Sequence, residues 1–273
     1  MKKTKSLLLS TPYLVWMVVF TLIPLGVVAY YALTDPATGA FSLGNVKSLG
    51  MYLPVLWKSI GYSLVSAFIC LLLGYPVAYY IAHRTPVMQK ILYMLVMLPM
   101  CMSFLLRTLA WVGLLQDTGI INTLLSKIGI GPLHMINTPG AVILGMIYNF
   151  LPYMILPIYS IMSKLDYRLV EAAQDLGCNS FGVLKRVIFP LSLPGVISGI
   201  TMVFVPSVST FYISQKLGGG KYLLVGDSIE MQFQSAYNYN LGASLSLVLM
   251  VMIIICMIIM NKFADNEEGA MII

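Results

Sequence analysis

The sequence contains little charge. Only 10% of its 273 residues are Asp, Glu, Lys or Arg, whereas 59% are hydrophobic and the mean hydropathy is +0.89. Because soluble domains average about 25% charged residues, a soluble fold of this length would lack the charge to cover its surface. The composition therefore predicts an all-α protein whose helices cross a lipid bilayer several times.

Groups that carry out catalysis or hold metals are also scarce. The four cysteines and two histidines stand apart at Cys70, Cys101, Cys178, Cys256, His83 and His134. Neither histidine has a cysteine or carboxylate at ligand spacing, so we expect no metal site and no disulfide framework. The sequence also lacks a Ser/His/Asp arrangement, a paired-acid site and a nucleotide-binding P-loop. We therefore expect no catalytic residue and no enzyme activity in this chain.

Several apolar runs are long enough to cross a membrane, which takes about 20 residues. They predict six spans, at residues 7–33, 56–82, 91–115, 141–162, 187–213 and 241–260. The first run follows three lysines, as a signal peptide would, but it is too long for one, and we interpret it as a retained span. The six spans together predict one transmembrane domain over residues 1–273.

Lysine and arginine are distributed unevenly among the loops. With the N-terminus inside, ten lie on the cytoplasmic side: Lys2, Lys3, Lys5, Arg84, Lys90, Lys164, Arg168, Lys185, Arg186 and Lys262. Five lie on the outer side: Lys47, Lys58, Lys127, Lys216 and Lys221. Since cytoplasmic loops carry an excess of basic residues, this distribution predicts that both termini are cytoplasmic.

The predicted spans contain many prolines and one charged side chain. The prolines are Pro24, Pro76, Pro99, Pro152, Pro157, Pro194 and Pro206. Each frees a backbone carbonyl that neighbouring helices must satisfy, which indicates a packed and moving bundle, although proline is also common in membrane helices generally. Arg107 either serves a pathway or helix packing, or it snorkels to an interface. The scarcity of other charges within the spans argues against ion-coupled transport.

The loop at residues 164–190 is the most polar long segment between two apolar ones. It predicts two helices, with Asp166 and Ser180 as N-caps, Gly177 in a left-handed turn, and Pro190 as a kink or end. The residues spaced for one helical face are Leu165, Leu169, Ala172, Ala173 and Leu176. Such a unit is a connector, a DNA-binding helix-turn-helix or a docking element, and its place between two spans argues against DNA.

The same loop resembles the coupling motif of binding-protein-dependent ABC importer permeases. That motif is Glu-Ala-Ala, three residues, Gly, nine residues, and an apolar segment that ends in Pro. Glu171, Ala172, Ala173, Gly177 and Pro190 match it in register. Looser similarity to the spermidine/putrescine permeases of this family lies at residues 73–76, 107–108, 151–154, 157–160 and 211–214.

The resemblance implies a MetI-like ABC importer permease fold in a bacterial inner membrane, with cytoplasmic coupling helices. It implies a transport subunit that assembles with two copies of an ABC ATPase, a second homologous permease and an extracytoplasmic solute-binding protein, and not with nucleic acid. ATP and Mg²⁺ would bind the ATPase, so this chain would hold no cofactor. The residues that would couple to the ATPase are Glu171, Ala172, Ala173, Asp175, Gly177 and Pro190. The two alanines equally suit ordinary helix packing.

The resemblance also implies a polyamine substrate, a flexible polycation that carboxylates and aromatic faces attract. The candidates for the substrate path are Arg107, Trp111, Asp117, Tyr148, Tyr212, Asp227 and Glu230. The tryptophan and tyrosines alternatively belong to the aromatic belt of the membrane interface. Two alternative functions are an ABC importer permease for another small solute and a stand-alone secondary carrier that works without ATP.

Overall fold

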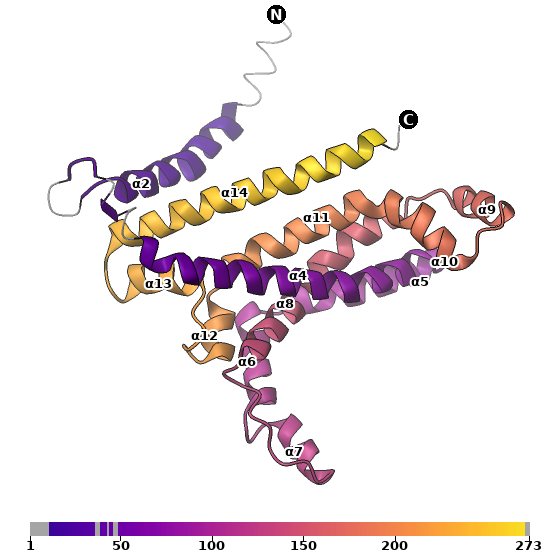
Figure 1. The fold of residues 1–273 in the computed structure, drawn as a ribbon, viewed down its shortest axis with the longest axis horizontal. Helices are drawn as coiled ribbons and strands as arrows, with labels where there is room; N and C mark the ends of the chain where they lie inside the picture. Colours follow the sequence, from indigo (N-terminus) through magenta and orange to yellow (C-terminus); the bar gives the residue numbers. More distant parts are fainter. Residues whose placement is uncertain (1–10, 36–38, 43, 46–48, 271–273) are drawn as a thin grey trace, which may run out of the picture. The chain divides into compact units, whose positions relative to one another are not determined.

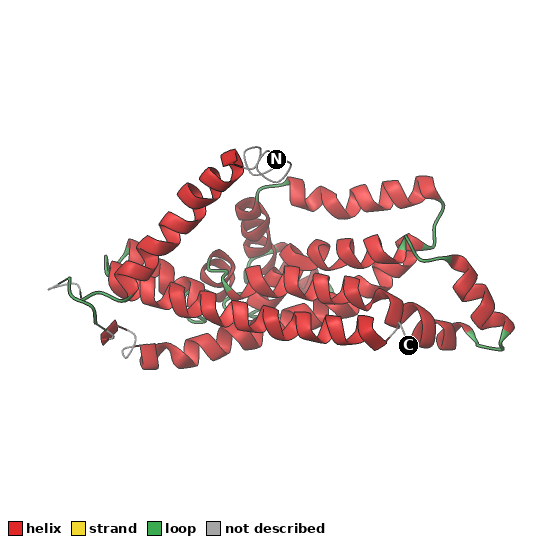
Figure 2. Ribbon diagram, turned by 90° about the horizontal axis from the view of Figure 1, so that it is seen from above, coloured by secondary structure: helices red, strands yellow, loops and turns green. Residues whose placement is uncertain are grey.

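The computed structural model describes residues 11–35, 39–42, 44, 45 and 49–270, which are almost entirely helical. Figure 2 shows helices and loops, and within these ranges the only backbone pairing of the β type is an isolated bridge between Thr34 and Phe41. The principal helices are α2 (Ile23–Ala32), α4 (Leu53–Ala82), α8 (Pro139–Met162), α11 (Phe189–Val208) and α14 (Tyr239–Ala270) (Figure 1).

Shorter helices lie between the principal ones. They are α5 (Pro86–Met97), α6 (Phe104–Leu115), α7 (Ile120–Lys127), α9 (Tyr167–Asp175), α10 (Ser180–Val183), α12 (Tyr212–Gly218) and α13 (Val225–Gln234). Two π-helical turns, η1 (Val18–Leu22) and η4 (Leu184–Ile188), and two 3₁₀ turns, η2 (Leu49–Tyr52) and η3 (Leu98–Cys101), connect or extend them.

The prediction of an all-α protein with six apolar spans is confirmed. Six helical segments of the described chain are long and apolar enough to cross a membrane: Thr11–Ala32, Leu49–Ala82, Phe104–Lys127, Pro139–Met162, Ser180–Val208 and Tyr239–Met260. Their apolar side chains are largely exposed on the isolated chain, as lipid-facing or partner-facing surfaces must be in a membrane.

The third predicted span, residues 91–115, is wrong as a continuous helix. The helix α5 ends at Met97, a 3₁₀ turn follows at Leu98–Cys101, and the backbone is extended at Met102 before α6 begins. Pro99 within the 3₁₀ turn has no N–H to donate to an α-helical ladder, which accounts for the break. The apolar segment that qualifies as a span here is Phe104–Lys127.

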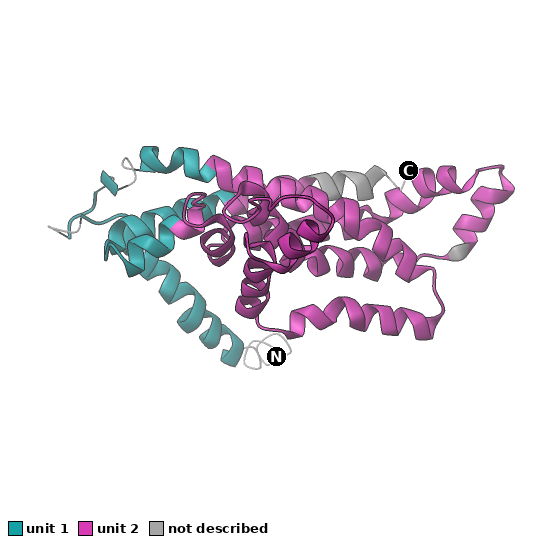
Figure 3. Cartoon of the chain, turned by 90° about the horizontal axis from the view of Figure 1, so that it is seen from below, with its two compact units in different colours: residues 1–56, 228–252 teal, residues 57–227, 253–273 magenta. Residues whose placement is uncertain are grey.

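The described residues form two compact units (Figure 3), of which unit 1 contains residues 1–56 and 228–252. Within unit 1, side chains near the start of α14 bind the end of α2. The Asn240 amide donates to the carbonyls of Tyr31 at 3.0 Å and Thr34 at 2.8 Å, and the Ser244 hydroxyl donates to that of Ala32 at 3.0 Å. These bonds satisfy carbonyls that a helix end leaves without an internal partner.

Unit 2 contains residues 57–227 and 253–273 (Figure 3), and within it α8 contacts α5, α6, α11 and α12. The helix α8 packs most extensively against α11, and Met146, Met154 and Ile158 are fully buried along it. A Cβ atom at Gly195 would lie 3.0 Å from the Pro157 carbonyl oxygen, so only glycine permits this approach of α11 to α8. Small residues bring membrane helices into such backbone contact.

Candidate functional site: the loop between α8 and α11

Two short helices, α9 and α10, form the loop that joins α8 to α11 (Figure 1, right). The Asp166 carboxylate accepts a hydrogen bond of 3.0 Å from the backbone N–H of Arg168, which confirms Asp166 as the N-cap of α9. The predicted second cap is wrong. Asn179 supplies the side-chain oxygen, 2.8 Å from the Gly182 N–H, and Ser180 is the first residue of α10. Both caps satisfy donors that would otherwise be orphaned.

Gly177 ends α9 in the predicted left-handed conformation, with φ at +83°. The Gly177 N–H donates to the Gln174 carbonyl at 2.8 Å, and the Cys178 N–H donates to the Ala173 carbonyl at 3.0 Å. This pair of bonds is the Schellman motif, which closes the end of a helix. A Cβ atom at Gly177 would meet nothing within 4 Å, so the backbone conformation, and not space, requires glycine here.

The sequence predicted that Pro190 either kinks or ends the helix, and the structure excludes an end there. The helix runs from Ser180 through η4 into α11, and Pro190 lies in the first turn of α11. A proline removes an N–H and its ring clashes with the carbonyl four residues earlier. The wider π-helical turn directly before it accommodates both effects. The continuous helix that contains the start of the predicted fifth span therefore begins at Ser180, seven residues before the predicted start of the span at residue 187.

The loop buries one set of apolar side chains and exposes another. Ala173 and Val183 are buried in the core, and Leu165 and Val170 pack against them. Of the residues spaced for one helical face, Leu169 and Leu176 are exposed, Leu176 with 86% of its surface, whereas Ala173 is buried. Phe181, which sequence reasoning missed, is 71% exposed. Exposed apolar side chains are typical of surfaces that contact another protein or the membrane.

Among the predicted coupling residues, Glu171, Ala172, Asp175 and Gly177 are exposed, whereas Ala173 is buried and Pro190 is half-buried. The accessible surface of the loop thus combines two carboxylates with the apolar Leu169, Leu176 and Phe181. The predicted coupling residues did not include Leu169, Leu176 and Phe181. Helical periodicity alone does not show that an apolar residue is exposed.

A cavity of about 500 Å³ lies at the base of this loop. Its walls come from the end of α4, the end of α8 and the start of α9: Ala82, His83, Arg84, Met162, Ser163, Leu165, Asp166, Val170 and Ile188. The Arg84 guanidinium stacks over the Tyr80 ring, 4.1 Å from its centre. Because protein interiors are otherwise closely packed, this space leaves α9 room to shift against α4 and α8.

Four of the predicted path residues lie around α6 within unit 2. Trp111 of α6 meets Tyr148 of α8 edge to face, with ring centres 5.3 Å apart. Tyr212 of α12 lies 6.2 Å from the Phe104 ring. Arg107 stands between these two contacts along α6 and is only 8% exposed. Its Nε and Nη1 atoms have no hydrogen-bond partner among the residues that the structure describes.

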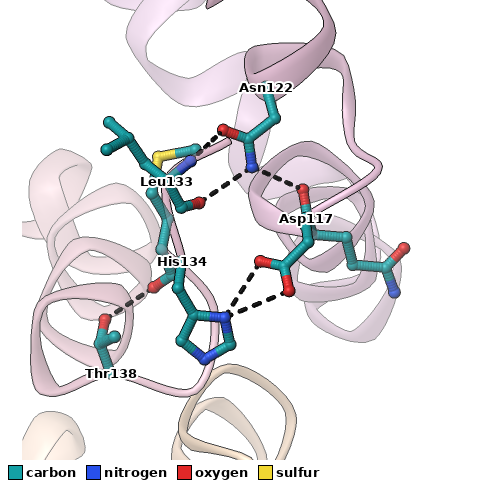
Figure 4. Close-up of polar contacts among 7 residues, drawn as sticks. Asp117, Asn122, Leu133, His134 and Thr138 are labelled. Carbon is teal, nitrogen blue, oxygen red and sulfur yellow. Dashed lines mark hydrogen bonds and ion pairs between the residues drawn. The ribbon is translucent and has the colours of Figure 1, made fainter. Parts of the chain in front are cut away.

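The remaining predicted path residues have other local partners. The Asp117 carboxylate lies 3.0 Å from Nδ1 of His134 in an exposed pair (Figure 4). Asn122 holds the same loop, since its amide donates to the Leu133 carbonyl and accepts from the Leu133 N–H, both at 2.9 Å. The sequence did not indicate the contact between Asp117 and His134, because the two residues are 17 positions apart.

Asp227 lies at the start of α13 and is 2% exposed. Its carboxylate accepts from the Leu224 N–H at 2.7 Å, and the neighbouring Val225 N–H donates to the Ser59 hydroxyl at 2.8 Å. Glu230 follows in α13 and is half-buried. Asp227 therefore orders the start of a helix. No cluster of three His, Cys, Asp or Glu side chains that could hold a metal occurs in the described ranges.

The chain matches the family of binding-protein-dependent transport system inner membrane components over residues 6–266. It therefore belongs to this family of ABC importer permeases, as the coupling-loop motif predicted, and is a membrane transport subunit.

The chain is 40% identical to the spermidine/putrescine transport system permease protein PotB of Haemophilus influenzae over 232 residues, which cover 82% of this chain and 81% of that protein. It is 36% identical to PotB of Escherichia coli over 227 residues, which cover 80% and 82%.

Solved structures show the same fold. A bacterial ABC transporter for the import of the acidic polysaccharide alginate has a chain with a TM-score of 0.77 and 16% identity, covering 97% of this chain and 96% of that one. An inward-facing form of the MetNI methionine ABC transporter gives a TM-score of 0.58 at 16% identity, covering 82% and 97%. The predicted MetI-like permease fold is confirmed.

The left-handed turn at Gly177 gives a test with a matched control. Gly177→Val places a β-branched residue in a conformation that costs an L-residue about 1–2 kcal/mol, whereas Gly177→Asn is tolerated there. Because no atom crowds the position, the two variants differ in backbone strain alone. We expect amide hydrogen exchange in α9 to be about 5- to 30-fold faster in the valine variant and near wild type in the asparagine variant. Equal exchange in both would show that the turn does not stabilise α9.

Proposed function

We propose that this chain is the permease subunit of an ATP-driven importer of spermidine and putrescine. The observation that carries the proposal is the similarity to two spermidine/putrescine permeases along four-fifths of their length. The similarity to the alginate and methionine transporters lies below the identity at which a substrate can be transferred, and it supports the fold alone.

In this proposal, the loop between α8 and α11 lies in the cytoplasm and docks into an ABC ATPase. Leu169, Leu176 and Phe181 supply apolar contact area, and Glu171 and Asp175 supply charge. A charged rim around an apolar centre is the ordinary composition of a protein interface. Both chain termini would be cytoplasmic as well, in agreement with the excess of basic residues on that side.

The loop would act as a lever between the ATPase and the spans. Caps at Asp166 and Asn179 and the turn at Gly177 make α9 and α10 rigid. The unbroken helix from Ser180 through η4 transmits any displacement directly into α11, which packs on α8. The cavity at the base of the loop leaves α9 space to move. Closure of the ATPase pair around ATP would therefore tilt α11 and α8 together.

The complete importer would contain this chain, a second homologous permease, two copies of the ATPase and an extracytoplasmic solute-binding protein. ATP and Mg²⁺ would bind the ATPase. The family to which the chain belongs is described as binding-protein-dependent, which supports a partner of the last kind. High affinity for the polyamine would reside in the binding protein, so this chain needs a path and not a tight site.

Uptake by the reconstituted complex tests the proposed function. Proteoliposomes that contain both permeases and the ATPase are expected to accumulate labelled spermidine only with ATP on the ATPase side and the binding protein on the other. ATP-dependent uptake of a different solute would keep the importer and discard the polyamine. Uptake by this chain alone without ATP would contradict the proposal and indicate a secondary carrier.

The docking surface has its own test. Leu176→Glu and Phe181→Glu place a charge in the proposed interface, where it cannot be solvated. We expect each to weaken co-purification of the ATPase by about tenfold or more, the loss typical of a central interface residue. The matched control is Ile128→Glu after α7, since Ile128 is equally exposed at 74% but lies outside the loop. ATPase binding at the wild-type level in both loop variants would exclude this surface as the contact.

A further inference from the structure

A cavity of about 340 Å³ lies at the break between α11 and α12 in unit 2. Its lining includes four aromatic rings and two hydroxyl side chains: Phe104, Phe150, Phe211, Tyr212, Ser209 and Thr210. Cavities of about 300–1,000 Å³ that combine aromatic walls with a few polar groups are the common form of a small-molecule site. Sequence reasoning assigned only Tyr212 of this set to the substrate path.

The break itself adds negative electrostatic potential to the cavity. The helix α11 ends at Val208, and α12 begins at Tyr212 after a residue of non-helical conformation, Phe211. The last carbonyls of α11 form the negative end of the helix dipole, and the Ser209 hydroxyl donates to two of them, those of Val205 at 3.3 Å and Pro206 at 3.4 Å. Transporters place cations at such ends of discontinuous helices.

The chain already places an ammonium group on one of these rings. The Nζ atom of Lys216 lies over the Tyr212 ring, 5.7 Å from its centre, within the range of a cation–π interaction. No charged side chain lines the cavity in the described part of unit 2, so a cation bound there would be held by ring faces, hydroxyls and carbonyls. An alkylammonium group suits this lining, because its methylenes would contact Phe150 and Leu105 while its charge faces the rings.

We propose that this cavity is a transit site for one alkylammonium segment of the polyamine, which passes through it during import. The inference rests on the proposed function and adds the residues that contact the substrate. Two positive groups lie nearby, Arg107 one turn from Phe104 on α6, and Lys216 on α12. These two positive groups weaken cation binding at the cavity. Weak binding suits a transport path, because the substrate must be able to leave each site.

The test uses the complete reconstituted importer and measures the KM for spermidine uptake. Phe211→Leu and Tyr212→Leu keep an apolar side chain and remove a ring face. We expect each to raise KM by about 3- to 30-fold, the range that a partly desolvated cation–π contact provides. Tyr212→Phe, which retains the ring, is expected to recover most of the lost affinity. The control is Phe68→Leu on α4, an exposed ring outside the cavity, which is expected to leave KM unchanged.

A second measurement covers the case in which the leucine variants do not assemble. Incorporation of mono-, di- and trifluorophenylalanine at Phe211 preserves the ring shape and progressively removes its negative face. The proposal requires KM to rise with each fluorine, and a flat series overturns it. Loss of the second permease from the purified complex in Phe211→Leu, with KM unchanged in the fluorinated series, would identify the cavity as a subunit contact.

The outcomes separate the two proposals. Wild-type spermidine uptake with unchanged KM in Phe211→Leu and Tyr212→Leu keeps the importer function and overturns the transit site. Failure of the wild-type complex to import any polyamine overturns the proposed function, and the transit site falls with it.

Discussion

The close approach of α11 to α8 is the constraint on which the rest of unit 2 depends. Gly195 and Gly199 bring the backbone of α11 against Pro157 and Met154, at distances that no larger residue permits. With little hydrophobic driving force between helices in lipid, such contact relies on van der Waals packing. Because the same two helices are joined by the loop of α9 and α10, a force on the loop acts on a packed pair and not on a single flexible span.

The polar groups of the loop and of the helix breaks are satisfied locally, which lets irregular backbone persist beside apolar spans. Asp166, Asn179 and the Gly177 turn close the ends of α9 and the start of α10. The π-helical turn η4 accepts Pro190 without ending the helix. At one of the helix breaks, between α11 and α12, the surrounding aromatic rings and hydroxyls line the cavity that we assign to the substrate.

Much of this architecture could be predicted from the sequence, because the bilayer imposes length and apolarity on every span. The six spans and the turn at Gly177 follow from such local rules. The prediction of one span over residues 91–115 was wrong at Pro99, because it relied on hydropathy, whereas the proline there interrupts the helix. The exposure of Leu169 and Leu176 could not be predicted, because periodicity groups apolar residues on one helical face but cannot tell a core from an exposed surface. The pairing of Asp117 with His134 and the convergence of Phe104, Phe150 and Phe211 depend on tertiary contacts, which no local pattern encodes.

We propose that the loop of α9 and α10 transmits the closure of the ATPase pair to the membrane spans. The most direct test is the number of ATP molecules hydrolysed per spermidine imported, measured in the reconstituted complex with Gly177→Val and Gly177→Asn. A lever that depends on the rigid turn predicts that the valine variant hydrolyses ATP while uptake falls, so that the ratio rises, and that the asparagine variant keeps the wild-type ratio. An unchanged ratio in the valine variant would contradict the account.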